Sequence, residues 1–183
     1  MKWIRKPALE PLAVSMSGVK LGDRLLVIGC SDPMLIVALA SKAGLTGRAC
    51  AVDESAARAA EAGRIAEKEG ALIETAAAPG WQLSYDESTF DIVVVRSMLS
   101  GTSDDSRSPA AREAIRVLRP GGRCVAIEGR TRRGLSSLMG GGQAATTDAD
   151  EVRGALVAAG FVAVRTLAER DGMLFVEGVR KNR

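Results

Sequence analysis

Short apolar runs alternate with helical patterns along the chain. Five runs have the length of strands, at residues 24–28, 48–52, 71–75, 90–95 and 123–128. Four helical patterns lie between or after them, at residues 33–43, 55–69, 110–118 and 147–159. This alternation predicts parallel strands joined by right-handed crossovers, with helices on both faces of the sheet.

The last part of the chain has the pattern of a hairpin. Two apolar runs, Val162–Ala168 and Met173–Val179, flank the turn-forming dipeptide Asp171-Gly172. A hairpin makes one of its strands antiparallel to the rest. The sequence therefore predicts an α/β fold: a Rossmann-like three-layer sandwich with a mainly parallel seven-stranded sheet and a C-terminal antiparallel hairpin. The strand residues expected to be buried are Leu25, Val27, Val93, Val95, Val125 and Ile127.

Local signals indicate where helices begin and end. Asp32 is a good N-cap, Pro33 suits the first helical position, and Gly44 suits the position after the last turn. Thr147 and Asp150 have the spacing of a capping box at the start of the last helix.

Composition narrows the class of protein. The 183 residues are 46% hydrophobic and 26% charged, which is typical of one folded domain, so residues 1–183 are expected to form a single domain. No apolar run is long enough to span a membrane. A net charge of +3 and only 3% aromatic residues argue against a nucleic-acid partner.

The chain contains no histidine, which excludes a Ser-His-Asp triad and any zinc site that needs His. We expect no metal site. Cys30, Cys50 and Cys124 are far apart and show no CxxC spacing. They are expected to be reduced, mostly buried thiols, which predicts a cytoplasmic protein.

Three stretches carry a resemblance to a known family. They are Val19–Cys30 (VKLGDRLLVIGC), Leu83–Val93 (LSYDESTFDIV) and Glu113–Glu128 (EAIRVLRPGGRCVAIE). Together they resemble the class I S-adenosylmethionine-dependent methyltransferases, in particular the ubiquinone and menaquinone methyltransferase branch. The resemblance implies methyl transfer from S-adenosylmethionine to an unidentified small-molecule acceptor.

An open α/β sheet places its ligands at the carboxyl ends of the strands. In the resemblance, Gly29 matches the first glycine of the Gly-x-Gly-x-Gly loop, Asp53 the acid that binds the ribose hydroxyls, and Ala76 a position near the adenine amine. The implied cofactor-binding residues are Gly29, Cys30, Ser31, Asp53, Glu54, Ala76, Ala77 and Arg96. No catalytic residue is assigned.

The glycine loop departs from the family pattern. Ser31 replaces the second glycine and Pro33 the third, and Val27 replaces an acidic residue. Ser31 adds a Cβ where a ligand approaches, and Pro33 removes an amide donor. The expected result is weak or lost cofactor binding. The alternative function is therefore a non-catalytic methyltransferase-like subunit that binds a protein partner, and a homo-oligomer is also open.

Several residues have two readings. Asp53 could bind ribose or cap the next helix, and Arg96 could bind an acidic substrate or be a solvated loop residue. Tyr85 could lie near adenine or pack in the core. Arg130, Arg132 and Arg133 form either a solvated loop or an anion contact. Residues 1–20, 96–109 and 129–146 are the segments that could cover the site. A nicotinamide dehydrogenase is disfavoured by Pro33 and by the terminal hairpin.

Overall fold

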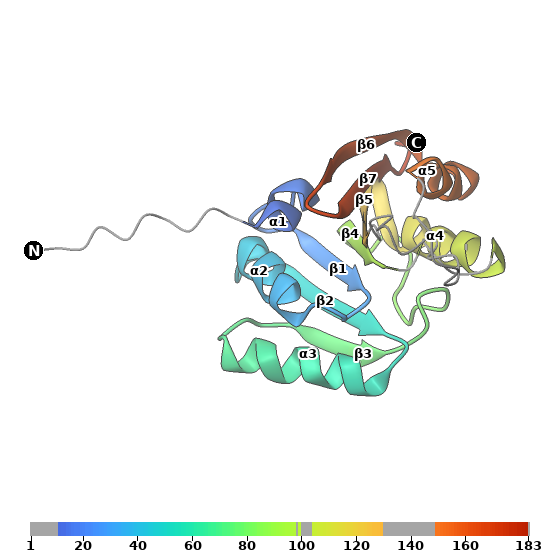
Figure 1. The fold of residues 1–183 in the computed structure, drawn as a ribbon. Coiled ribbons are helices and arrows are strands. Elements are labelled where there is room, and N and C mark those ends of the chain that lie inside the picture. The colour runs from blue at the N-terminus through green and yellow to red at the C-terminus, as the bar shows by residue number, and fades with distance from the viewer. Residues whose placement is uncertain (1–10, 98, 100–103, 130–148, 183) are drawn as a thin grey trace, which may run out of the picture.

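The chain folds around one seven-stranded sheet with helices on both sides (Figure 1). A computed structural model describes residues 11–97, 99, 104–129 and 149–182. The strands are β1 (Arg24–Ile28), β2 (Arg48–Asp53), β3 (Glu74–Ala77), β4 (Phe90–Arg96), β5 (Leu118–Gly129), β6 (Val162–Arg170) and β7 (Met173–Val179). The helices are α1 (Leu12–Ser17), α2 (Pro33–Ala43), α3 (Ala56–Lys68), α4 (Asp104–Val117) and α5 (Ala149–Ala158).

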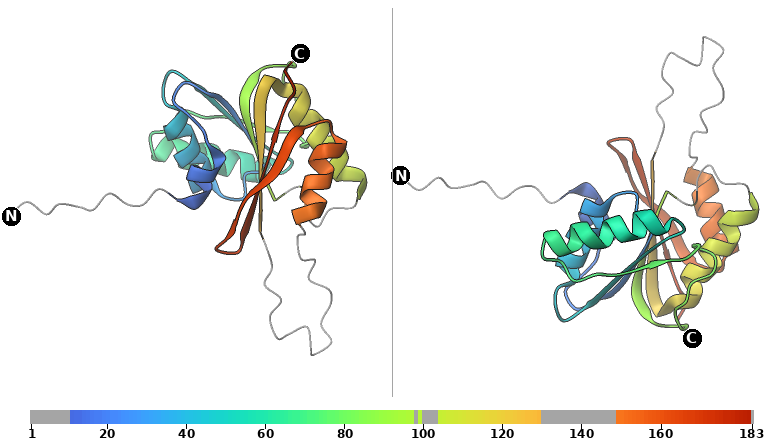
Figure 2. Two further views of the ribbon diagram at one scale, coloured as in Figure 1. Left: turned by 90° about the horizontal axis from the view of Figure 1, so that it is seen from above. Right: turned by 90° about the horizontal axis from the view of Figure 1, so that it is seen from below.

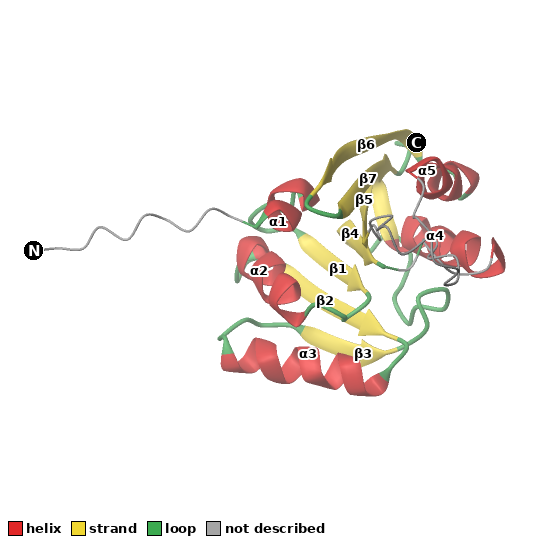
Figure 3. Cartoon of the chain, viewed as in Figure 1, coloured by secondary structure: helices red, strands yellow, loops and turns green. Residues whose placement is uncertain are grey.

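The order of strands in the sheet is β3-β2-β1-β4-β5-β7-β6 (Figure 3). Each neighbouring pair among β1 to β5 is parallel, whereas β7 is antiparallel to both β5 and β6. The predicted mainly parallel sheet with a C-terminal antiparallel hairpin is confirmed. The next two strands are added outward on one side of β1, in the order β2 and then β3. The chain then returns to the other side of β1, where β4 lies, so the direction of winding reverses between β1 and β4.

Helices lie on both sides of the sheet (Figure 2), and the sheet separates two apolar clusters. Leu25 and Val27 of β1 pack with residues of α1 and α2, whereas Leu26 and Ile28 pack in the cluster that contains residues of α4 and α5. Successive strand residues point to opposite faces, so a strand covered on both sides is apolar throughout. The six strand residues predicted to be buried are at most 1% exposed.

The predicted ends of the helix at residues 33–43 are confirmed. The Asp32 carboxylate accepts a hydrogen bond from the Leu35 amide (3.1 Å), and Pro33 is the first residue of α2. Gly44 follows the last turn of α2 with a φ of +70°, and its amide donates to the Ala40 carbonyl (2.9 Å). Thr147 lies outside the described residues.

Three predicted boundaries were wrong. The third strand covers 74–77 rather than 71–75, because the Ala71 amide still donates to the Ala66 carbonyl at the end of α3 and pairing with β2 starts at Glu74. The Arg48 guanidinium holds Glu74 at that first pair (2.6 Å). Helix α4 begins at Asp104, six residues earlier than predicted, with Pro109 inside it.

Strand β5 also begins earlier than predicted, at Leu118, and contains the Pro-Gly-Gly segment. The Gly121 amide donates to the Arg180 carbonyl, and the Arg180 amide donates to the Gly122 carbonyl, so this segment is tied to the chain that follows β7. Helix α1 was not predicted, because its six residues are too few for a helical pattern to stand out.

Two expectations from composition can be compared with the fold. Cys30, Cys50 and Cys124 are all buried and free, as predicted. Among the described residues, none of the helices has the length and apolar character needed to cross a bilayer.

Candidate functional site

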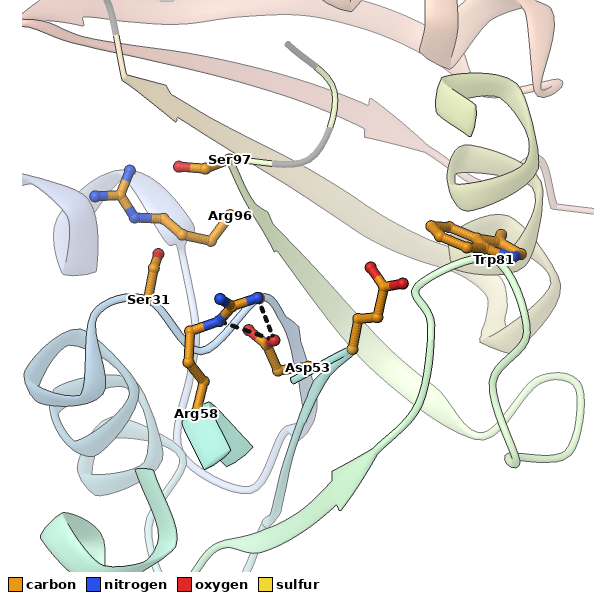
Figure 4. A pocket seen from close by; sticks show the side chains of 8 residues that line it. Ser31, Asp53, Arg58, Trp81, Arg96 and Ser97 are labelled. Carbon is orange, nitrogen blue, oxygen red and sulfur yellow. Dashed lines mark hydrogen bonds and ion pairs between the residues drawn. The ribbon is translucent and has the colours of Figure 1, made fainter. Parts of the chain in front are cut away.

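A pocket of about 260 Å³ lies at the carboxyl ends of β1, β2 and β4 (Figure 4). Its lining residues are Gly29, Ser31, Asp53, Glu54, Arg58, Trp81, Arg96 and Ser97. Gly29 follows β1, Asp53 ends β2 and Arg96 ends β4. The winding of the chain reverses between β1 and β4, and ligands of open α/β sheets bind in the crevice at such a reversal. The pocket therefore lies where this fold places a ligand.

Gly29 brings two strand ends into close contact. Its φ is +99°, and a Cβ added there would lie 2.5 Å from the Arg96 carbonyl oxygen. The Gly29 amide also donates to the Val52 carbonyl of β2 (2.8 Å). A side chain is excluded both by the backbone angle and by the neighbouring backbone, so glycine is needed here for the fold as well as for ligand approach.

Asp53 is a buried carboxylate that joins the ends of β1 and β2. Its Oδ2 accepts a hydrogen bond from the Cys30 amide (2.7 Å), and its Oδ1 accepts one from the Ser55 amide (2.8 Å). The side chain of Ser55 in turn caps α3 by accepting from the Arg58 amide. Asp53 is thus not itself the helix cap, but it holds the capping residue in place.

Arg58 covers the remaining face of the Asp53 carboxylate. Its Nε and Nη2 lie 2.9 Å and 2.7 Å from Asp53 Oδ1. Burial acts to raise the pKa of the Asp53 carboxyl, but the hydrogen bonds from Arg58, Cys30 and Ser55 outweigh burial and the pKa is lowered. Three donors converge on Oδ1 and one on Oδ2, so a ribose diol could engage both oxygens only after Arg58 moves.

The second arginine of the pocket has a different environment. The Nε and Nη1 atoms of Arg96 are buried and have no hydrogen-bond partner in the part of the chain that the structure describes. In Figure 4 the Arg96 side chain extends past Ser31, away from the Asp53–Arg58 pair. The pocket therefore contains one arginine that is neutralised by a carboxylate and one whose buried nitrogens are unsatisfied.

The far side of the pocket is formed by the loop between β3 and β4. Trp81 of this loop is 40% exposed and lines the pocket. The loop is held by two residues of α4: the Leu83 amide donates to Glu113 (3.0 Å), and Arg116 donates to the Tyr85 carbonyl (2.9 Å). Glu113 and Arg116 also pair with each other (2.8 Å). Two residues of the EAIRVLRPGG stretch therefore support the wall of the pocket.

Sequence reasoning found most of the pocket, but not all of it. Among the predicted cofactor-binding residues, Gly29, Ser31, Asp53, Glu54 and Arg96 line the cavity, and Cys30 contacts Asp53 through its amide. Ala76 and Ala77 are exposed residues of the edge strand β3 and are absent from the described lining. Arg58 and Trp81 were missed, although an arginine in the first turn after Asp53 and a tryptophan after Pro79-Gly80 were visible signals.

Two other candidate residues, Cys30 and Tyr85, have surroundings that favour a structural role. Burial, followed by the nearby Asp53 charge, raises the pKa of the Cys30 thiol to about 12, so this thiol is not a ready nucleophile. Tyr85 packs edge-on against Phe90 with the ring centres 5.0 Å apart, which is the core-packing reading. Arg130, Arg132 and Arg133 lie outside the described residues.

The fold and the pocket define a class of protein: a Rossmann-like domain with a ligand site at the strand reversal and an acid at the end of β2. Residues 25–122 match the Methyltransferase domain family, which is more than half of the chain. The chain therefore belongs to this family of class I S-adenosylmethionine-dependent methyltransferases, as the sequence resemblance indicated.

Individual relatives agree with this assignment. The chain is 30% identical over 135 residues to the chloroplastic 2-phytyl-1,4-beta-naphthoquinone methyltransferase of Arabidopsis thaliana, covering 71% of this chain and 51% of the relative. The chain thus spans about half the length of that curated relative. A SAM-dependent methyltransferase from Aquifex aeolicus has a similar structure, with a TM-score of 0.76 and 19% identity over 91% of this chain and 86% of its own.

The same fold is also found in a protein that is named for a different reaction. The [4+2]-cyclase SpnF superposes with a TM-score of 0.72 and 18% identity, over 96% of this chain and 80% of its own. Structural similarity at this level of identity establishes the fold, and the reaction has to be argued from the site.

Proposed function

We propose that the chain transfers a methyl group from S-adenosylmethionine to a small-molecule acceptor. The observation that carries the proposal is the buried Asp53 carboxylate beneath the Gly29 turn, in the pocket at the strand reversal. An acid at the end of the second strand is suited to a ribose diol, because a carboxylate accepts hydrogen bonds from both hydroxyls.

The lining of the pocket fits the chemical parts of such a cofactor. Asp53 offers a carboxylate for the ribose, Ser31 and the backbone of Cys30 lie beside the turn, and Trp81 offers an aromatic face. Glu54 follows Asp53 and also lines the pocket. The family resemblance expects the adenine near Ala76 and Ala77, which lie on the strand that pairs with β2. Arg96 offers a cation to a negatively charged group.

The chemistry asks little of the protein beyond positioning. When bound, the cofactor supplies a methyl group that a positive sulfonium has already activated. The chain's residues then need to orient the acceptor and to keep water out, and positioning alone can contribute much of the rate. We assign no general base, which suits an acceptor that is already nucleophilic.

We expect binding of modest affinity. Ser31 and Pro33 reduce the space and the donors of the turn, and Arg58 competes for Asp53. We further propose that residues 1–183 act as one domain, that the protein is cytoplasmic, and that the acceptor is small. The quinone named for the Arabidopsis relative is a reasonable first acceptor to assay.

Calorimetric titration with S-adenosylmethionine and S-adenosylhomocysteine tests this function. We expect both to bind wild type, and Asp53→Asn to weaken binding at least about tenfold, which corresponds to about 1.4 kcal/mol. Asp86→Asn, which changes an exposed acid outside the pocket lining, is the matched control. Thermal unfolding checks that Asp53→Asn remains folded.

Cofactor binding is a requirement for the enzyme, so a negative result bears on the alternative function. A folded wild-type protein that binds neither compound would contradict the proposed function. That outcome would favour the alternative, a methyltransferase-like subunit that binds a protein partner or a second copy of itself.

A further inference from the structure

Two buried guanidinium nitrogens of Arg96, which have no partner among the described residues, are the feature of this pocket that the fold does not explain. Leaving a buried donor without an acceptor costs free energy, and the cost is greater for a charged group. Its Nε and Nη1 atoms nevertheless have no partner. Arg58, the other pocket arginine, shows what this fold does with a structural cation, because it is paired with Asp53 at 2.7 Å.

Arg96 is placed where a ligand in the pocket could satisfy its unpartnered nitrogens. Arg96 is the last residue of β4, and its carbonyl oxygen meets the Gly29 turn at the strand reversal. The following residue, Ser97, has a φ of +53°, an unfavourable angle for a residue with a side chain. Its amide donates to the Ile127 carbonyl of β5 (3.0 Å), which holds this strained exit from β4 in place. The backbone thus fixes the root of the Arg96 side chain beside the pocket.

We propose that Arg96 binds a planar oxyanion, in the first instance a carboxylate, inside this pocket. A guanidinium presents two parallel pairs of N–H donors, Nε with Nη2 and Nη1 with Nη2, and each pair matches the two oxygens of a carboxylate. Either pairing would give one of the two unpartnered nitrogens of Arg96 an acceptor. The hydroxyl group of Ser97, which also lines the pocket, would be an additional donor. This inference rests on the proposed function for the identity of the pocket.

The carboxylate can come from two sources: the amino-acid part of the cofactor or the acceptor molecule. Two nucleosides distinguish them. S-adenosylhomocysteine carries the carboxylate, and 5′-methylthioadenosine shares the nucleoside part but lacks the amino-acid part. If the cofactor is the source, Arg96→Met weakens S-adenosylhomocysteine at least about tenfold and leaves 5′-methylthioadenosine within about twofold of wild type.

If the acceptor is the source, Arg96→Met leaves both nucleosides unchanged. Benzoate, used as a carboxylate probe on protein saturated with S-adenosylhomocysteine, then binds wild type and loses binding in Arg96→Met. Arg96→Lys, which keeps the charge but not the planar pair of donors, should recover only part of the affinity in either case. Arg112→Met, an exposed arginine of α4, is the matched control for loss of charge.

Stability provides a readout that does not depend on a ligand. If Arg96 is kept for binding, Arg96→Met removes an unsatisfied buried charge and raises the unfolding temperature of the free protein, by about 2–6 °C. If Arg96 had a structural role, the same substitution would lower it. A lower unfolding temperature combined with unchanged binding of both nucleosides and of benzoate would overturn the proposal.

The two hypotheses fail in different ways. If wild type binds neither nucleoside, the methyltransferase proposal fails, but titration of the free protein with benzoate still tests Arg96. Benzoate binding to wild type and not to Arg96→Met would then support an oxyanion site in a pocket of another function, and no benzoate binding to wild type would overturn it.

Discussion

Gly29 and Arg96 meet so closely that a single added carbon would not fit between them. A Cβ on Gly29 would lie 2.5 Å from the Arg96 carbonyl oxygen, and the Gly29 backbone has a φ of +99°. This contact sets the separation of β1 and β4 at the strand reversal. At this point the pocket is therefore lined by backbone that leaves no room for a side chain.

Gly29→Ala should destabilise the fold through both clash and backbone strain, by about 2–4 kcal/mol in the free energy of unfolding. Gly70→Ala is the matched control, because Gly70 has a φ of +73° but nothing within 4 Å of an added Cβ. It should therefore show the strain alone, about 1 kcal/mol. Urea unfolding measures both, and equal losses in the two variants would contradict the close contact.

Arg58 should act as a competitor for the ligand at Asp53. The Arg58 side chain is 57% exposed, so solvent partly screens the ion pair and its contribution to stability is small. Releasing Asp53 Oδ1 by Arg58→Gln should thus strengthen S-adenosylhomocysteine binding by up to about fivefold. The effect should shrink at high salt, which already weakens the ion pair in wild type.

Arg64→Gln provides the control for this prediction. Arg64 lies on the same helix and pairs only with the partly buried Glu61 among the described residues. Its substitution removes the same charge from α3 without touching the pocket. Weaker binding in Arg58→Gln than in Arg64→Gln would mean that Arg58 assists the ligand instead of competing with it.

The carboxylate of Glu113, which holds the loop that forms one wall of the pocket, should make the stability of the fold depend on pH. The hydrogen bond from Arg116 lowers the pKa of the Glu113 carboxyl, and the Leu83 amide adds to the effect. A group with a lowered folded-state pKa stabilises the fold above its unfolded-state pKa, and this stability is lost as the pH falls. Glu113 should therefore contribute fully at neutral pH and progressively less below about 4.5.

Glu113→Gln should lower stability at pH 7 and flatten its loss between about pH 5 and 3. The loop should also loosen, which is measurable as greater solvent exposure of Trp81 by fluorescence in a Trp3→Phe background. Glu67→Gln, which changes an exposed acid of α3, should leave the Trp81 signal unchanged. An acid unfolding curve of Glu113→Gln that parallels wild type would contradict this role.

The fold could be predicted from the sequence more completely than the site could, and particular residues show why. Strands such as Arg24–Ile28 are encoded locally, by an apolar run that a glycine or an acid ends. Strand β3 was misplaced by three residues because its start depends on a partner far away in the chain, through Arg48 and Glu74. Local pattern contains no information about such pairing.

The site depends even more on relations between distant residues. Asp53 could be recognised from its place at the end of a strand, but its saturation by Arg58 could not, because an exposed arginine in a helical pattern is usually solvated. Likewise, the two readings of Arg96 could be separated only by asking whether its nitrogens had partners. Which charged groups pair with one another is decided only in the folded chain. The sequence therefore predicted the residues of this pocket better than their interactions.

The turn after β1 offers a test of whether its departures from the family pattern matter. Pro33 is the first residue of α2 and has no amide hydrogen, and Ser31 contributes a side chain to the pocket lining. Pro33→Ala restores one donor at the helix start, and Ser31→Gly removes the side chain. Each change should tighten S-adenosylhomocysteine binding, by about fivefold for one added hydrogen bond worth about 1 kcal/mol. Both should lower thermal stability slightly, because the chain gains freedom when unfolded. The two single variants separate the missing donor from the crowding side chain, and unchanged affinity in both would show that the substituted turn binds its ligand as well as a glycine turn would.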